Sequence, residues 1–325
     1  FLLLSSLSQI LFLNIKEYAV VNSMVELSKL KSINSSPKFI NGCLRNFLRK
    51  KNEFIKFEIF FEDLPHWFKA NIKNITKKEK SDLIKNILKQ PSLHIVFKDN
   101  IDYNIYNNIG KFTSKNSLAI SENYSFSEIP NYEKGEWWVQ DFSSMLPLSL
   151  IEISKKIIIA DVGSAPGGKL FQLMSKNENV ISFEKSENRA ALLKKNLLRL
   201  NLDPKINICD FLNISEDNKF DLIILDAPCT SVGTVRRNPE IFFKNIEPNM
   251  SSLLKIQYKL LEKSSKILKK NGIIIYMVCS FLETETINQI NIFLKNYNNF
   301  SLVKFNKKND NISKDFINKD GIYLT

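Results

Sequence analysis

The chain has 325 residues, enough for about two domains, and 44% of them are hydrophobic, so a large core is possible. Its 46 Lys and Arg residues against 34 Asp and Glu residues give a net charge of +12, which favours a polyanionic partner, although a general bias toward Lys, Asn and Ile explains it equally well. The four cysteines lack paired spacing and only two histidines accompany them, which argues against a zinc site or a disulfide framework and for reduced thiols in a cytoplasmic protein.

The amino-terminal part, residues 1–60, is predicted to be helical. Ser36 and Pro37 supply an N-cap and a proline for a first helical turn, and an apolar stripe that includes Cys43 follows, with basic residues outside it. Cys43 is therefore expected in a core. The apolar start of the chain, residues 1–13, is too short and too polar to span a bilayer, and no basic region precedes it as in a secretory signal. No membrane association is predicted.

Residues 61–135 give weaker signals and are expected to form a small α+β region. A helix is predicted near residues 78–88 and a short strand at residues 94–97, followed by a polar stretch rich in Asn. Trp137 and Trp138 come directly after this region. These two side chains could be core aromatics or could line the approach to a pocket, and a place in the core is the preferred interpretation.

The remainder, residues 136–325, alternates apolar strands with amphipathic helices. Two of the predicted helices span residues 186–200 and 251–270, and Asn271 with Gly272 is expected to end the second. Strands that alternate with helices predict an α/β domain with a doubly wound, mostly parallel sheet.

The first strand of this domain, residues 157–162, runs into a glycine-rich turn. The residues of the turn are Gly163, Ser164, Ala165, Pro166, Gly167, Gly168 and Lys169. Glycines permit a sharp turn and a close backbone approach to a ligand, and the following helix offers unpaired N–H groups. The turn lacks the GxGxxG spacing of dinucleotide sites, and Leu170 stands where a phosphate loop needs a hydroxyl for magnesium. A nucleoside cofactor without a pyrophosphate therefore fits best.

Acidic residues follow the next two apolar stretches. Glu184 comes at the spacing where doubly wound folds place an acid against ribose hydroxyls, and Asp210 ends a third short strand. Either residue alone could be a solvated loop carboxylate. Acids at successive strand ends are better explained by a ligand site.

Two cysteines occupy corresponding places after further apolar runs. Cys229 lies in Asp226-Ala227-Pro228-Cys229, just past one run, and Cys279 lies just past residues 273–278. Continuous apolar runs are typical of parallel strands, so both thiols are expected at the carboxyl edge of the sheet, facing one pocket. Two buried cysteines at strand ends would be the simpler explanation of the thiols alone, but their coincidence with the glycine-rich turn favours a catalytic role.

Carbon 5 of cytosine offers a reaction that needs such a group of residues. This carbon is not nucleophilic until a thiolate adds to carbon 6; it can then take a methyl group from a sulfonium donor, after which a base must remove its proton so that the thiol can leave. Cys279, Cys229 and Asp226 supply a soft nucleophile, a helper group and an acid for the ring nitrogen. The residues themselves do not tell the two thiols apart. A methyltransferase for exocyclic amino groups would instead carry an Asn- or Asp-Pro-Pro-aromatic turn, which the sequence lacks.

Five segments resemble a known family. Those in the second half of the chain look like the signatures of the RNA cytosine-5 methyltransferases, and those in the first half like a NusB-like helical domain. The chain is most similar to the bacterial family of ribosomal RNA small-subunit methyltransferase B, also called Sun or Fmu, and looks truncated at both ends. The segments are residues 161–169, 226–240, 276–280, 17–22 and 38–46. Gly163-Ser164 departs from the usual Cys-Ala of the family, and Glu283-Thr284-Glu285-Thr286 departs from its usual acidic run ending in Asn.

The resemblance implies a Rossmann-like class I methyltransferase domain at residues 136–325, preceded by a partial NusB-like RNA-binding domain at residues 1–60 and a linking α+β region at residues 61–135. It implies Cys279 as the nucleophile and Cys229 as the residue that assists product release. It also implies S-adenosylmethionine as the methyl donor, held by Gly163, Ser164, Ala165, Pro166, Gly167, Gly168, Lys169, Glu184, Asp210 and Asp226.

The expected substrate is a cytosine of 16S ribosomal RNA in a single-stranded or splayed-out conformation, because a paired base would not expose carbon 6. Arg236, Arg237 and Lys169 are the predicted RNA contacts. Two alternatives remain: a methyltransferase for transfer RNA or another RNA, or a non-catalytic RNA-binding module for ribosome assembly. A cytoplasmic monomer without a metal ion is expected.

Overall fold

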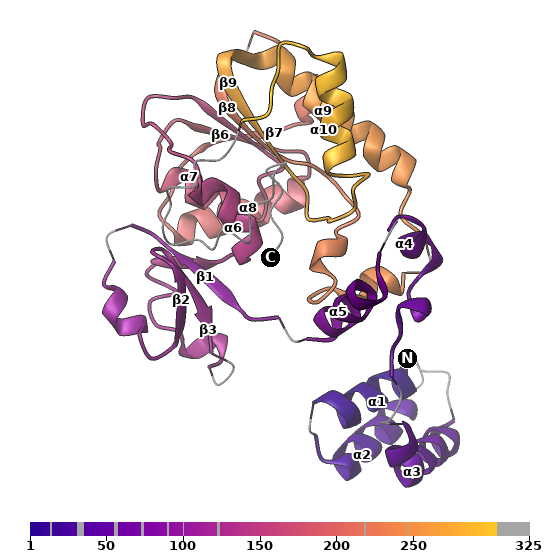
Figure 1. Ribbon diagram of the computed structural model, residues 1–325. Helices are drawn as coiled ribbons and strands as arrows, with labels where there is room; N and C mark the ends of the chain where they lie inside the picture. Colours follow the sequence, from indigo (N-terminus) through magenta and orange to yellow (C-terminus); the bar gives the residue numbers. More distant parts are fainter. Residues whose placement is uncertain are drawn as a thin grey trace. The chain divides into compact units, whose positions relative to one another are not determined.

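The computed structural model describes residues 1–303 except 14, 31–35, 55–57, 73–74, 90, 100, 122–123, 218 and 245. The chain divides into two compact units, Phe1–Asp63 and Leu64–Thr325 (Figure 1). Within the described ranges, no helix has both the length and the apolar character needed to cross a bilayer.

The first unit is helical, as the sequence predicts. Its helices are α1 (Leu2–Phe12), α2 (Glu17–Ser28) and α3 (Pro37–Phe54), followed by a 3₁₀ turn at Phe61–Asp63. Helix α3 begins at the expected place, because the Phe39 N–H donates to Ser36 Oγ at 3.4 Å. The apolar stripe of α3 is narrower than expected, since Ile40 and Leu44 are buried but Cys43 is only half-buried and Phe39 is 61% exposed.

The second unit begins with two helices and a small antiparallel sheet. The helices are α4 (His66–Ala70) and α5 (Lys77–Leu88), and the strands are β1 (His94–Phe97), β2 (Gly110–Ser114), β3 (Ser117–Ile120) and β4 (Trp137–Val139), in the order β2-β3-β1-β4. The predicted helix and strand are confirmed, but the Asn-rich stretch also contains the β2–β3 hairpin. Trp137 and Trp138 are buried and contribute to two different cores, because successive residues of a strand point to opposite faces. Their predicted place in the core is confirmed.

A five-stranded parallel sheet carries the rest of the unit. Its strands are β5 (Ile159–Val162), β6 (Val180–Glu184), β7 (Lys205–Ile208), β8 (Phe220–Asp226) and β9 (Leu268–Met277), in the order β7-β6-β5-β8-β9. The chain proceeds outward from β5 to β7, returns to β8 and proceeds the other way to β9. The strand order therefore reverses between β5 and β8, which is the place where doubly wound sheets bind ligands.

Helices cover both faces of this sheet (Figure 1). They are α6 (Phe142–Ser149), α7 (Gly168–Met174), α8 (Glu187–Arg199), α9 (Met250–Ile267) and α10 (Ile287–Asn296). Leu222 and Ile224 of β8 pack into a core with α6, α7 and α8, whereas Ile223 and Leu225 pack into a second core with α9 and α10. This alternation accounts for the unbroken apolar run of β8, because both of its faces are buried. The predicted doubly wound α/β fold is confirmed.

One predicted boundary is wrong. The helix expected at residues 251–270 ends at Ile267, and β9 begins at the next residue. Leu268 already pairs with Phe220, and the fully buried Ile267 belongs to the core beneath the sheet. Asn271 does adopt a left-handed conformation, with φ 64°, but its turn interrupts the strand instead of ending the helix.

Candidate active site

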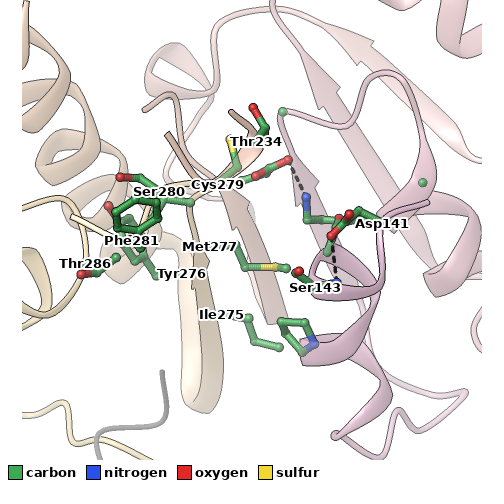
Figure 2. Close-up of a pocket in the computed structure, with 18 of the residues that line it drawn as sticks. Asp141, Ser143, Thr234, Ile275, Tyr276, Met277, Cys279, Ser280, Phe281 and Thr286 are labelled. Carbon is green, nitrogen blue, oxygen red and sulfur yellow. Dashed lines mark hydrogen bonds and ion pairs between the residues drawn. The ribbon is translucent and has the colours of Figure 1, made fainter. Parts of the chain in front are cut away.

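A pocket of about 1110 Å³ lies at the carboxyl edge of the parallel sheet (Figure 2). The turn after β5, the end of β8 and the segment after β9 contribute to its lining. Its position matches the reversal of strand order between β5 and β8. From the predicted sites it brings together Gly163, Ser164, Ala165, Pro166, Gly168, Lys169, Asp226, Arg236, Arg237 and Cys279. Gly167, Glu184, Asp210 and Cys229 are not among the residues that line it.

The two thiols are nevertheless side by side. Cys279 is exposed toward the pocket and Cys229 is half-buried behind it, with the two Sγ atoms 3.3 Å apart. The parallel pairing of β8 with β9 explains this distance, because Asp226 lies opposite Met277 and each cysteine follows its strand within three residues.

The neighbours of the two sulfur atoms separate the acidities of the thiols. A hydrogen bond from the Cys229 thiol lowers the pKa of Cys279 to about 6, against the effect of burial, and Ser231 adds to the lowering. The same hydrogen bond raises the pKa of Cys229, and burial raises it further. The pair therefore loses its first proton from Cys279, while Cys229 keeps its own.

An ion pair lies beside the thiols at the end of β8. Lys169 Nζ donates to Asp226 Oδ2 at 2.7 Å, and the side chains are 15% and 32% exposed. Burial alone would lower the pKa of Lys169, but the negative charges of Asp226, Asp161 and Cys279 raise it above its ordinary value. Lys169 therefore holds a proton in the pocket at neutral pH.

Asp161 is a buried carboxyl group in the same pocket and was not among the predicted site residues. It lies within β5, is 1% exposed, and neither of its side-chain oxygens has a hydrogen-bond partner among the described residues. Burial raises the pKa of Asp161 to about 7. Because burying a polar group without hydrogen bonds is unfavourable, this carboxyl group is expected to bind a ligand that donates hydrogen bonds. The available signal in the sequence was an acid inside an otherwise apolar strand.

The glycine-rich turn leaves no room for side chains at its tightest points. Gly163 and Gly167 have φ values of 80° and 120°, and a Cβ atom would come within 2.8 Å of Asp226 O at the first position and within 2.0 Å of the Phe171 ring at the second. Glycine has no Cβ atom, so it alone can adopt these positive φ values so close to the neighbouring atoms. The Ser182 hydroxyl fixes the turn by donating to Ser164 Oγ at 2.8 Å.

The two acids at the ends of β6 and β7 brace the backbone next to the pocket. Glu184 is 3% exposed and accepts the N–H groups of Ala165 at 3.2 Å and Ser186 at 2.9 Å. Asp210 accepts a hydrogen bond from Lys185 Nζ at 2.7 Å, which lowers its pKa. Contacts of these acids with a cofactor stay a prediction.

The predicted RNA-binding arginines already have protein partners. Arg237 forms an ion pair with Asp141, and Arg236 Nε donates to Lys89 O at 3.2 Å. Both arginines also line the pocket. Their contact with RNA stays a prediction.

Glu285 was noted in the sequence only as a departure from a pattern, but it anchors the Cys229 turn. It is completely buried and accepts hydrogen bonds from the Thr230 N–H at 2.9 Å, from the Thr230 hydroxyl and from Gln257 Nε2 at 3.1 Å. Gln257 Nε2 also donates to Pro228 O at 2.9 Å. The turn that carries one thiol is thereby fixed to the segment that follows the other.

The fold and the site define a Rossmann-like methyltransferase with a glycine-rich cofactor turn and a thiol pair. Residues 149–321 match the family described as 16S rRNA methyltransferase RsmB/F, and residues 1–49 match the NusB family. The chain belongs to the 16S rRNA methyltransferase RsmB/F family.

Similar proteins agree with this assignment. Ribosomal RNA small subunit methyltransferase B of Yersinia enterocolitica is 26% identical over 94% of this chain and 75% of the relative, and that of Photorhabdus laumondii is 27% identical over 98% and 78%. Among solved structures, the protein PH0851 shares the fold with a TM-score of 0.72 at 22% identity, over 90% of this chain and 71% of that one. A methyltransferase homologue from Pyrococcus horikoshii has a TM-score of 0.56 at 27% identity, over 65% and 72%.

The chain is therefore an enzyme, an S-adenosylmethionine-dependent methyltransferase of the small-subunit ribosomal RNA class. This favours the enzyme over the non-catalytic RNA-binding module. The residues of the pocket fit the cofactor, because the Asp161 carboxyl, whose oxygens have no hydrogen-bond partner in the described part of the chain, can accept its donor groups, and the glycine-rich turn admits close approach.

Proposed function

We propose that the protein methylates carbon 5 of a cytosine in 16S ribosomal RNA through a transient bond between Cys279 Sγ and carbon 6 of the base. The observation that carries this proposal is the 3.3 Å distance between the two Sγ atoms beside the cofactor turn. A single thiol would suffice for addition, but release of the product needs a second group near the same ring.

Cys279 performs the addition. Its lowered pKa leaves the sulfur largely ionised at neutral pH, and the thiolate is the nucleophilic form. When the S–C6 bond forms, electron density moves from the C5–C6 bond toward the ring nitrogen, and carbon 5 becomes nucleophilic. S-adenosylmethionine, when bound, supplies an electrophilic methyl group. The proton that Lys169 holds against Asp226 stabilises the charge that develops on the ring.

Cys229 takes up its role only after the addition. While Cys279 is a thiolate, its charge and the hydrogen bond between the thiols keep the proton on Cys229. Both effects disappear when Cys279 becomes a neutral thioether, so Cys229 can then ionise to solvent. Its thiolate removes the proton of carbon 5, the S–C6 bond breaks, and Cys279 leaves as a thiolate. The coupling of the thiols thus supports different roles for them, Cys279 in the addition and Cys229 in the later release of the product.

The RNA reaches the pocket as an unpaired nucleotide. The exposed Arg237 can exchange the half-buried Asp141 carboxylate for a phosphate, and Arg236, its neighbour in the chain, also lines the pocket. The amino-terminal domain, residues 1–60, adds an independent basic surface, since Lys38, Arg49 and Lys50 are exposed on α3. The division into residues 1–60, 61–135 and 136–325 is part of this proposal.

Two variants and a control test the assignment, with the full chain, radiolabelled S-adenosylmethionine and 16S ribosomal RNA from cells that lack the gene. Cys279→Ala abolishes methyl transfer. Cys229→Ala permits addition but not release, so a covalent protein–RNA adduct accumulates in denaturing electrophoresis. Cys209→Ala, which removes a thiol that does not line the pocket, behaves as the wild type. An adduct with Cys279→Ala contradicts the assignment, and bisulfite sequencing of ribosomal and transfer RNA identifies the modified cytosine.

A further inference from the structure

A hydroxyl group lies next to both thiols, and no step of the proposed mechanism has yet been assigned to it. Ser231 Oγ is 3.2 Å from Cys279 Sγ and 3.9 Å from Cys229 Sγ. The Ser231 hydroxyl is closer to Cys279, the proposed nucleophile. A catalytic role for this hydroxyl therefore rests on the proposed function.

The backbone holds this hydroxyl in an unusual conformation. Ser231 has φ 61° and ψ 20°, the left-handed region that residues other than glycine rarely adopt. Its carbonyl oxygen accepts hydrogen bonds from the Thr234 N–H at 2.8 Å and from the Thr234 hydroxyl at 2.9 Å. The Gly233 N–H donates to Cys279 O at 3.0 Å, which ties the turn to the backbone of the nucleophile. A glycine would adopt the same turn without strain, so folding alone does not explain a serine here.

The direction of the hydrogen bond changes with the ionisation of Cys279. A neutral thiol can donate to Ser231 Oγ, whereas a thiolate has no proton and can only accept, so the Ser231 hydroxyl must then donate. Lys169 and the Cys229 thiol also favour the ionised sulfur, and Asp226 opposes it. Glu285 and Tyr276 interact electrostatically with Cys229. Ser231 therefore favours the thiolate without adding a charge to the pocket.

We propose that Ser231 is a third catalytic residue, whose hydroxyl donates a hydrogen bond to the Cys279 thiolate before that sulfur attacks the base and again when it leaves. The thioether of the covalent intermediate is a weak hydrogen-bond acceptor, so the contact is strongest at the two ends of the reaction. No proton is transferred from the serine in either step. The benefit is confined to the pH range in which the thiol would otherwise be protonated.

Alkylation of the full chain without RNA tests the contact directly. The rate of Cys279 alkylation by iodoacetamide is followed by peptide mass spectrometry from pH 5 to pH 9. We expect half-maximal reactivity near pH 6 in the wild type. In Ser231→Gly and Ser231→Ala it moves upward by about one pH unit, which makes alkylation at pH 6 roughly fivefold to tenfold slower. Glycine tolerates the left-handed backbone, so that variant folds. Cys209 in the same samples is the control thiol, and its reactivity is unchanged.

Single-turnover methyl transfer over the same pH range tests whether the contact matters for catalysis. Both variants should lose a similar factor at pH 6 and match the wild type near pH 9, where Cys279 is ionised without help. An unchanged Cys279 alkylation profile in both variants overturns the proposal. So does a shifted alkylation profile with an unchanged pH profile of methyl transfer, because the contact would then be merely structural. Failure of the proposed function is distinguishable, since it shows as methyl transfer by Cys279→Ala.

Discussion

At the carboxyl edge of the parallel sheet, the ends of β6 and β7 carry carboxylates, whereas the segments after β8 and β9 carry thiols. Glu184, on the carboxylate side, accepts two backbone N–H groups and stabilises the cofactor turn. The sulfur atoms of Cys229 and Cys279 contact each other and one hydroxyl. One side of the edge uses its polar atoms to fix the backbone, and the other keeps them available for reaction.

The difference follows from what supports each side. Hydrogen bonds from backbone N–H groups stabilise a carboxylate and take up part of its capacity as an acceptor. A reactive thiol needs neighbours that favour its ionised form and still leave it accessible, so its turn must be held by other residues. Glu285 does this from behind, where it is buried and binds Thr230. The thiol side therefore depends on an anchor that does not touch the pocket.

Glu285→Ala should have the largest effect, because it removes this anchor and leaves the Thr230 N–H and one N–H of the Gln257 amide without their acceptor. We expect a loss of about 3 kcal/mol in the free energy of unfolding. Displacement of the thiols should slow single-turnover methyl transfer by about a hundredfold. Urea denaturation and rapid-quench kinetics measure the two effects. Glu283→Ala, an exposed acid of the same run, is the matched control. A wild-type rate in Glu285→Ala would show that the thiols hold their geometry without the anchor.

Asp161→Asn tests the part of the cofactor pocket between the carboxylate side and the thiol side. It should raise the stability of the protein and lower its affinity for the cofactor. The pKa of Asp161 is raised to about 7, so its contribution to stability is present at low pH and is lost as the pH rises through 7. The variant should therefore stabilise the ligand-free protein at pH 8. It should also bind S-adenosylmethionine about tenfold more weakly at that pH, because an ionised carboxylate is the better acceptor for the amino group of the cofactor.

Calorimetric titration at several pH values checks this prediction. Wild-type affinity should increase between pH 6 and pH 8, and the increase should be absent in Asp161→Asn. Asp203→Asn, an exposed acid beyond α8, should leave both the affinity and its pH dependence unchanged. Equal pH profiles for the wild type and Asp161→Asn would mean that the carboxyl group does not meet the cofactor.

The two sides also differ in how far the sequence predicts them. Strand ends were predictable because buried parallel strands produce continuous apolar runs, and the polar residue after each run reaches the edge. The residues that support the thiols were not predictable. A left-handed turn brings Ser231 to Cys279, and Glu285 reaches Thr230 across 55 positions of the sequence. The end of α9 was missed for a similar reason. Pairing of Leu268 with β8 overrides a helical pattern that looks continuous.

Asp210→Asn should have the smallest effect and decides whether the carboxylate side also contacts the cofactor. Asn caps the 3₁₀ turn after β7 as well as Asp does, so only the ion pair with the exposed Lys185 is lost, about 0–1 kcal/mol. The pKa of Asp210 is lowered, so the contribution of this pair is present above pH 4 and disappears as the pH falls below it. Urea denaturation at pH 7 and pH 3 should show a small difference from the wild type that becomes smaller in acid. If the affinity for S-adenosylmethionine also falls, Asp210 binds the cofactor as the sequence predicts; if only stability changes, this carboxylate is confined to bracing the fold.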